Sequence, residues 1–380
     1  MDFNYSEEQL GLQDSLQRFV TKDYGFEKRR ALLTSSEGFS REAWKTYAEL
    51  GILALPFPEE VGGLGGNAVD TMLVMQVLGA GLVLEPYVPT VILAGSLIRD
   101  FAAPAQREAL LGPVAEGASL LALAHHEPGV RYAVQRVATK AEKKGAGYAL
   151  SGHKAVVLGA ASADQLLVSA RTSGNERDAD GVTLFLVDPK AKGVTLRPYR
   201  TQDGQRAADV LLDGVEVAAD AVIGTEGAAL PAIERALDYA NAALCAEAVG
   251  IMRALNDATL EYLKTRKQFG VLIGSFQALK HRMAHMTIAT EQASSMAILA
   301  AVKADSADAD ERRRSVAGAK AYVMQQARLV GQQAVQLHGG IGVTDELIVS
   351  HWFKRLTTIG MTFGDVDHHL ARYGELLQAA

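Results

Sequence analysis

The sequence has few of the features that mark secreted, nucleic-acid-binding or membrane-spanning proteins. Its 380 residues include one cysteine, Cys245, so no internal disulfide can form, and we expect a reducing, cytoplasmic location. The formal net charge is −6 and no long basic run occurs, which argues against a nucleic-acid surface. The N-terminus has no basic segment followed by an apolar run, so we expect no secretory signal.

No uninterrupted apolar run is long enough to cross a membrane. The most apolar stretch, residues 79–98, is broken by Glu85, Pro86 and Pro89. A spanning helix needs roughly 20 mostly apolar residues, so this stretch predicts buried helix and loop.

The periodicity of apolar residues changes twice along the chain, which predicts an α+β protein with three domains. Residues 1–118 have helical spacing and begin with a capping box at Ser6 and Gln9. Residues 119–226 predict a small β-barrel or sandwich, because short strand-like segments alternate with Gly and Asp. Residues 227–380 predict a four-helix bundle. The expected strands are 121–124, 135–141, 147–150, 155–158, 165–170, 183–187, 194–198 and 208–212; the expected bundle helices are 230–266, 276–302, 316–337 and 347–356, with 304–314 as an exposed connection.

The most distinctive motif runs from Tyr262 to Gly270 and continues as Ile273-Gly274-Ser275-Phe276-Gln277. It resembles the segment between the first two bundle helices of the flavin-dependent acyl-CoA dehydrogenase family, which holds the pyrophosphate of FAD. Arginine suits this role because it stays charged and can bond two phosphate oxygens at once. The resemblance implies that Arg266, Gln268 and Phe269 bind FAD, with Phe269 on the same face as Arg266 if the helix continues. Taken alone, the same residues also describe a surface arginine and a core phenylalanine.

A second motif, residues 336–344, is similar to the glycine pair after the third bundle helix of that family. Glycine lets the backbone approach phosphate and ribose closely, although a glycine here also suits a helix C-cap. The resemblance implies that Gln336, Gly339 and Gly340 contact FAD held mainly by a neighbouring subunit. The stretch from Leu50 to Gly65 resembles the family's N-terminal loop, so the likeness covers essentially the whole chain.

The usual catalytic base of the family is missing from both of its known positions. The reaction needs a carboxylate to remove the α-proton of a CoA thioester while the β-hydride goes to the flavin. Aligning Gly364 with the family's Glu-Gly-Thr segment places Phe363 where the glutamate belongs. The alternative base position, on the first bundle helix, falls on Ala240, with Asn241 beside it in place of a common arginine.

The β region also departs from the family at the residues that would contact the flavin ring. The family strand carries a Lys-x-Trp-(Ile/Val)-Thr pattern, in which the tryptophan covers the ring and the threonine bonds near the hydride-accepting nitrogen. Val156 and Leu158 stand at those positions here. Lys154 matches the lysine of this pattern. The turn Glu127-Pro128-Gly129 matches the family, but its continuation, Val130-Arg131-Tyr132, does not. We therefore expect this chain's own flavin-ring pocket to bind flavin poorly.

Together these matches and losses predict a subunit that completes the FAD site of a base-carrying homologue in a heterotetramer. The Val156 strand and the Asp-x-Asp-His-His ending resemble the small, base-lacking subunits of pimeloyl-CoA and steroid side-chain dehydrogenases. The substrate would be a CoA thioester of a fatty, dicarboxylic or sterol-derived acid.

Two other functions stay open at this point. A self-sufficient dehydrogenase, as a homo-oligomer, could use Asp365 or Asp367 as a displaced base, although either aspartate also suits the N-cap of the last helix. A non-enzymatic acyl-CoA-binding or scaffold protein would have no use for a pyrophosphate clamp.

Three other candidates carry little chemistry. Asp238 should face away from the alternative base position. No ligand set accompanies the adjacent histidines at 125–126 and 368–369, so we expect no metal site. Cys245 lies on an apolar helix and is expected to be buried and inert.

Overall fold

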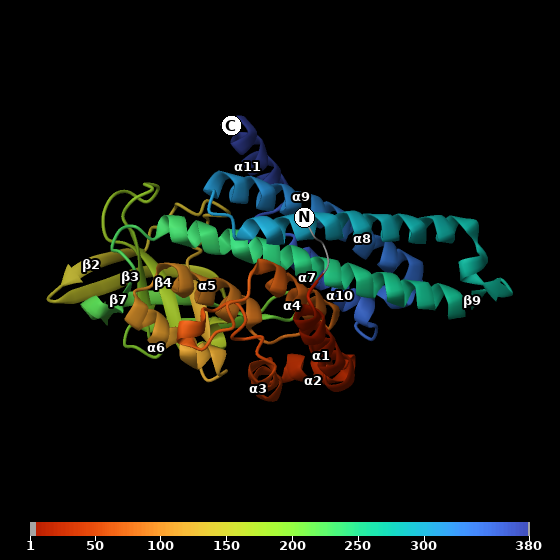
Figure 1. Cartoon of the computed structure of the whole chain (residues 1–380), viewed down its shortest axis with the longest axis horizontal. Coiled ribbons are helices and arrows are strands. Elements are labelled where there is room, and N and C mark those ends of the chain that lie inside the picture. The colour runs from red at the N-terminus through yellow and green to blue at the C-terminus, as the bar shows by residue number, and fades with distance from the viewer. Residues whose placement is uncertain (1–4, 379–380) are drawn as a thin grey trace. The chain divides into compact units, whose positions relative to one another are not determined.

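The structure is a computed structural model that describes residues 5–378. Helices come first, then a β-sheet, then long helices, which confirms the predicted α+β class and its order (Figure 1). The chain forms two compact units: Met1–Ala31, Ala68–Val83 and Asn241–Ala380 make the first, and Leu32–Asn67 and Leu84–Ala240 make the second. The predicted domain boundaries at residues 118 and 226 stay a prediction.

The regular elements of the N-terminal region, residues 5–118, are all helices. Ser6 and Gln9 form the predicted capping box, which satisfies two backbone donors at the start of the first helix. The apolar stretch at 79–98 includes a buried π-helical segment, Val88–Gly95. No helix of residues 5–378 is both long and apolar enough to cross a membrane. The helices are α1 (Glu7–Asp23), α2 (Phe26–Thr34), α3 (Arg41–Glu49), α4 (Ala68–Ala80), α5 (Ser96–Phe101) and α6 (Pro104–Ala115).

The β region is one eight-stranded sheet with strand order β6-β7-β3-β2-β4-β5-β8, and β1 pairs in parallel with β4. The strands are β1 (Leu121–Ala124), β2 (Lys140–Lys144), β3 (Gly147–Leu158), β4 (Gln165–Arg171), β5 (Val182–Val187), β6 (Val194–Arg200), β7 (Arg206–Val217) and β8 (Val222–Ile223). Its core is built from inward-facing aliphatic side chains and the Tyr148–Phe185 ring pair.

Two strand predictions were wrong in their limits. Residues 135–139 are not a strand, because the buried Arg171 binds the carbonyl oxygens of Gln135 and Val137 and holds them as a loop. Residues 147–150 and 155–158 belong to one strand, β3, whose pairing with β7 shifts register twice. The bulges explain why the alternation looked interrupted.

The C-terminal region consists of α7 (Leu230–Thr265), α8 (Gln277–Ala304), α9 (Ala309–His338), α10 (Ile348–Ile359) and α11 (Val366–Gln378). Both α8 and α11 pack against α9, and α7 and α8 are joined by a short hairpin at β9 (Figure 1). A buried bidentate ion pair between Arg355 and Glu247 ties α10 to α7, at 2.5 and 2.7 Å.

The exposed connection predicted at 304–314 extends too far along the chain, because a helix begins within it. Asp308 accepts hydrogen bonds from the amides of Asp310 and Glu311, and α9 begins at Ala309. Arg312 is buried, with its guanidinium donating to the carbonyl oxygen of Ser306. The polar composition therefore belongs to a capped first turn of α9 and not to a loop.

Candidate cofactor-binding site

The hairpin between α7 and α8 presents Arg266 to solvent. Strands β9 (Lys267–Gln268) and β10 (Val271–Leu272) pair antiparallel, and Ile273 donates its amide to the carbonyl oxygen of Arg266 at 2.9 Å. The guanidinium of Arg266 has no ion-pair or hydrogen-bond partner among residues 5–378. From Tyr262 to Arg282 the chain has five Lys and Arg residues and no Asp or Glu, so the hairpin carries net positive charge.

Phe269 lies at the tip of this hairpin and not on the helix. The expectation that Arg266 and Phe269 share one helical face was wrong, because α7 ends at Thr265 and Phe269 adopts φ 54° in the turn. The ring is 90% exposed and lies edge-on to the ring of Phe276, with 6.3 Å between centroids. The alternative in which Phe269 is a core residue is thereby excluded, and the ring is available to cover an external apolar group. Gln268 is also exposed.

The second motif lies beside the first. The rings of Tyr262, on the last turn of α7, and His338, at the end of α9, stack at 4.5 Å, so the chain brings its two predicted FAD-binding segments together. Gln336 is exposed on α9, and Gly339 follows with φ 66° as the C-cap. A side chain at Gly339 or Gly340 would meet no atom within 4 Å.

The two glycines differ in what the fold requires of them. Gly339 needs to be glycine because its φ and ψ of 66° and −145° are accessible almost only to glycine. Gly340 has neither a positive φ nor a crowded surrounding. The helix-cap explanation therefore accounts for Gly339 but not for Gly340. An open, exposed glycine fits a site where another molecule approaches the backbone.

At the usual position of the base, the loop after α10 places Phe363, with φ 57°, ahead of Gly364, with φ 124°. Asn241 Nδ2 reaches the carbonyl oxygen of Phe363 at 3.5 Å, which is at the limit of a hydrogen bond. Ala240 is fully buried on α7. Neither family position for the base offers a proton acceptor.

The two aspartates after this loop have different roles. Asp365 accepts a hydrogen bond from the amide of His368 at 2.9 Å and so caps α11, as the N-cap alternative predicted. Asp367 is exposed in the first turn of that helix.

Two histidines and the lone cysteine complete this part of the first unit. Burial, followed by the charges of Lys320 and His368, lowers the pKa of His369 to about 2, so its buried imidazole stays neutral and weakly basic. Cys245 is fully buried, as predicted, and burial raises the pKa of its thiol to about 11, which disfavours the reactive thiolate. Residues 5–378 contain no group of three or more side chains suited to hold a metal ion.

In the second unit, β3 bulges where the family has its ring-covering residue. The register shift against β7 falls between Lys154 and Val157, and Val156 in the bulge has φ 52° and is 51% exposed. Its amide donates to Asp209 Oδ1 at 3.2 Å. A positive φ is unfavourable for a β-branched residue, so this bulge is held by its surroundings rather than by the preference of valine. Val156 has no hydroxyl or aromatic ring to offer a flavin.

Comparison with known proteins decides the family. The chain matches the N-terminal domain of acyl-CoA dehydrogenases over residues 6–118, the middle domain over residues 122–215 and the C-terminal domain over residues 229–375. It is 30% identical over 367 residues to the probable acyl-CoA dehydrogenase YngJ of Bacillus subtilis, covering 95% of this chain and 96% of that protein.

The chain belongs to the acyl-CoA dehydrogenase family.

Two similar solved structures are complexes of two different chains by their names. The Tcur3481–Tcur3483 steroid acyl-CoA dehydrogenase variant is 30% identical, with a TM-score of 0.87 and 98% of both chains covered. The ChsE4–ChsE5 complex of Mycobacterium tuberculosis is 26% identical, with a TM-score of 0.88 and full coverage of both chains. Members of the acyl-CoA dehydrogenase family are oxidoreductases, and their cofactor is FAD. The exposed guanidinium of Arg266 and ring of Phe269 on the hairpin, and the exposed Gly339 and Gly340 after α9, fit this cofactor.

A buried ion pair beneath the β3 bulge was not predicted from the sequence. Lys154 is fully buried and donates to Glu127 Oε1 at 2.7 Å, to Ser169 Oγ at 3.1 Å and to the carbonyl oxygen of His125 at 3.2 Å. Glu127 also accepts from the hydroxyl of Thr139 at 2.6 Å. All three protons of the ammonium are used, so this charge is compensated as burial requires.

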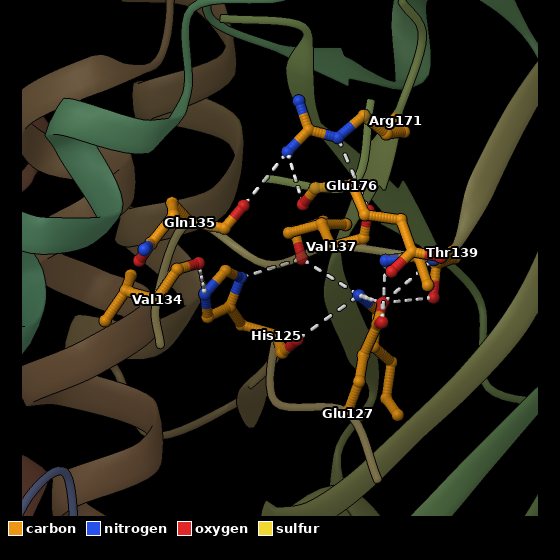
Figure 2. Close-up of polar contacts among 11 residues, drawn as sticks. His125, Glu127, Val134, Gln135, Val137, Thr139, Arg171 and Glu176 are labelled. Carbon is orange, nitrogen blue, oxygen red and sulfur yellow. Dashed lines mark hydrogen bonds and ion pairs between the residues drawn. The ribbon is translucent and has the colours of Figure 1, made fainter. Parts of the chain in front are cut away.

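The pair stays ionised near neutral pH. Burial acts to raise the pKa of Glu127, but the charge and hydrogen bond of Lys154 and the bonds from Thr139 outweigh it and lower the value to about 2. Burial lowers the pKa of Lys154 to about 8, with Glu127 acting in the opposite direction. Figure 2 shows how Glu127 and Thr139 meet at the centre of this network and how Arg171 holds the neighbouring loop. A lysine followed directly by the apolar run Ala155–Leu158 in a strand was the signal that could have revealed it.

Proposed function

We propose that this chain is the subunit of a flavin-dependent acyl-CoA dehydrogenase that lacks the catalytic base and completes the FAD site of a base-carrying homologue. The observation that carries the proposal is the contrast between Arg266, an exposed cation with no partner among the described residues, and Phe363, which stands where the base belongs. Arg266, Gln268, Phe269, Gln336, Gly339 and Gly340 would hold the dinucleotide.

The surface chemistry of these residues supports a role outside their own chain. A guanidinium binds a pyrophosphate through paired, charge-assisted hydrogen bonds. Phe269, at 90% exposed, gains by being covered, and Gly340 leaves its backbone open to approach. When bound, FAD accepts the hydride of α,β-dehydrogenation, while this chain's residues fix and neutralise its phosphates.

The residues around the position of the missing base support a division of roles between this chain and a partner subunit. Asp365 is engaged as a helix cap, and His369 is buried and too weakly basic to take the α-proton. We infer that proton removal belongs to the partner subunit. The names of both structures support a two-chain assembly, and the name of the steroid acyl-CoA dehydrogenase supports a CoA thioester with a sterol-derived acyl group.

Flavin content, measured by visible absorbance, tests the proposal directly. The chain purified alone should carry little flavin, and the chain co-purified with a base-carrying homologue should carry about one FAD per pair of chains. In the mixed complex, Arg266→Ala should weaken FAD binding by roughly 30- to 100-fold, because a bond to a charged group contributes about 2–3 kcal/mol. Arg177→Ala serves as the matched control, since Arg177 is an exposed arginine of the second unit.

Two results would contradict the proposal. Full flavin occupancy with dehydrogenase activity in the chain alone would show that the ring pocket at Val156 is intact and would move attention to Asp365 and Asp367. Unchanged FAD affinity of the Arg266→Ala complex would remove the hairpin from the cofactor site.

A further inference from the structure

The first unit has a groove of about 540 Å³ that none of the residues discussed so far lines. It lies among α1, α4 and α7, with the first residues of α2 and α10 at its edge. On α7 its arginine, Arg253, precedes Arg266 by 13 positions, about 20 Å along a helix. The groove is therefore separate from the FAD-binding hairpin, and its volume suits a small molecule. Apolar walls come from Val20, Val77, Ala80 and Ala254.

Arg253 is fixed at the groove by two uncharged acceptors. Its guanidinium donates to Gln76 Oε1 at 3.0 Å and to Ser294 Oγ at 2.9 Å. Gly250 makes this possible, because a side chain there would collide with the backbone of Gln76 and push α4 away from α7. No carboxylate of residues 5–378 pairs with Arg253, so its charge is oriented but not neutralised. An arginine held in this way retains N–H groups for an external anion.

Gln76 offers a second donor at the Arg253 end of the groove. It lines the groove and is only 6% exposed, and its side-chain oxygen is used by Arg253. Its amide nitrogen makes no hydrogen bond within the part of the chain that the structure describes. That nitrogen is not among the fully buried side-chain atoms left without a partner, so solvent reaches it from the groove and a ligand carboxylate there could accept from it.

Two helix starts reinforce the preference for an anion. Phe26, the first residue of α2, and Ile348, the first residue of α10, both line the groove. The N-cap of α10 provides no side-chain hydrogen bond. The first amides of a helix lack intrahelical acceptors and carry partial positive charge, so both favour a negative group nearby.

Asp257 gives the groove a second, opposite end. It lies one turn after Arg253 on the same face of α7 and is the one acidic side chain in the lining. No cation of the described residues pairs with it. A molecule with a carboxylate at Arg253 and a donor group about 5–6 Å away, one helical turn, would satisfy both ends.

We propose that this groove binds a small carboxylate that carries an amine or hydroxyl donor, through Arg253 and Gln76 at the carboxylate and Asp257 at the donor. The inference does not rest on the proposed function. The two sources of the donor, an amino acid or a hydroxy acid, share this chemistry and are separated by the choice of probe.

Isothermal titration of the full chain, or of its complex, with 4-aminobutyrate, 4-hydroxybutyrate and butyrate tests the proposal. The first two should bind more tightly than butyrate, and the tighter of them identifies the donor. Arg253→Gln should weaken all three by about tenfold or more, the loss of one charged hydrogen bond. Asp257→Asn should reduce only the donor-bearing probes to the level of butyrate, and Arg177→Gln should change nothing.

Gln76→Glu keeps the test decisive if Arg253→Gln folds poorly. A glutamate there would neutralise Arg253 from within, so binding should be lost while the thermal midpoint stays at or above that of the wild type. The FAD content of the mixed complex should not change in any of these variants, which separates this site from the hairpin. Absence of saturable binding at millimolar probe, or equal binding by wild type and Gln76→Glu, would overturn the proposal.

Discussion

The FAD-binding hairpin and the β3 strand differ in which of their residues match the family. The matching residues Arg266, on the hairpin, and Gly340, just after α9, are both exposed; the Arg266 side chain has no partner among the described residues, and a side chain at Gly340 would meet nothing within 4 Å. On β3 the matching residue, Lys154, is fully buried in an ion pair, whereas the exposed Val156, two positions later, does not match.

This difference distinguishes residues that are explained by the stability of the fold from residues that are explained by binding a ligand. A buried lysine paired with a buried glutamate cannot be replaced alone without leaving an unpaired charge, so Lys154 is explained by stability. An exposed side chain on the same strand carries no such constraint, and Val156 has no aromatic ring with which to cover a flavin. Exposed residues that match the family, such as Arg266 on the hairpin, are not explained by the stability of the fold and therefore indicate a ligand.

The largest effect is expected on the buried side of this comparison. Lys154→Met leaves Glu127 buried and unpaired and should lower the free energy of unfolding by about 3–5 kcal/mol, measured by urea denaturation. The double variant Glu127→Gln/Lys154→Met removes both charges and should recover part of the loss. A single-variant loss below about 1 kcal/mol would show that the pair is not what holds β3.

The pH dependence of the free energy of unfolding tests the same buried ion pair of Glu127 and Lys154. The folded pKa of Glu127 is lowered to about 2, so its contribution is present above the ordinary glutamate pKa of 4.5 and is lost as the pH falls from there toward 2. The expected loss is a few kcal/mol, and Glu127→Gln should flatten this acid limb in urea melts at several pH values. The folded pKa of Lys154 is lowered to about 8, so its linkage makes stability rise between pH 8 and 10.5. An acid limb that is unchanged in Glu127→Gln would contradict the assignment.

On the exposed side, Gly340→Leu separates a ligand contact from a structural one. A side chain there meets nothing within 4 Å, so the free energy of unfolding should change by less than about 0.5 kcal/mol. In the mixed complex the same side chain should intrude on FAD and speed its release by about tenfold, followed by flavin fluorescence. Gly342→Leu is the contrasting control, because its side chain would strike the backbone of Val335 and destabilise the fold itself. Unaltered FAD release in Gly340→Leu would place the cofactor elsewhere.

The smallest expected effect comes from restoring the base alone. Phe363→Glu supplies a carboxylate at the family position, but Val156 and Leu158 still lack the ring cover and the hydroxyl. The variant without a partner should therefore show no dehydrogenase activity with an artificial electron acceptor. The triple variant Phe363→Glu/Val156→Trp/Leu158→Thr, which also restores the ring cover and the hydroxyl, is the control for the single variant Phe363→Glu. Activity in the single variant would show that the ring pocket was never lost.

How far the sequence predicted the fold depended on whether the signal was local. Long helices such as α7 were predicted nearly to the residue, because an apolar stripe persists over many turns and ends at an identifiable break. The start of α9 was misplaced because a capped, polar first turn has the composition of a loop. The limits of β2 were missed because Arg171, far along the chain, holds residues 135–139 out of the sheet.

The sequence by itself identified the family and the α+β order, and it singled out the residues proposed to hold FAD and Phe363 at the position aligned with the base, since each depends on residue type at a fixed spacing. Only the tertiary structure decided which of those residues are free. It placed Phe269 at an exposed hairpin tip, committed Asp365 to a helix cap, paired Lys154 with Glu127, and fixed Arg253 with neutral partners only. The physical reason is that burial and hydrogen bonding join residues distant in sequence, and whether a charge is satisfied depends on those partners alone.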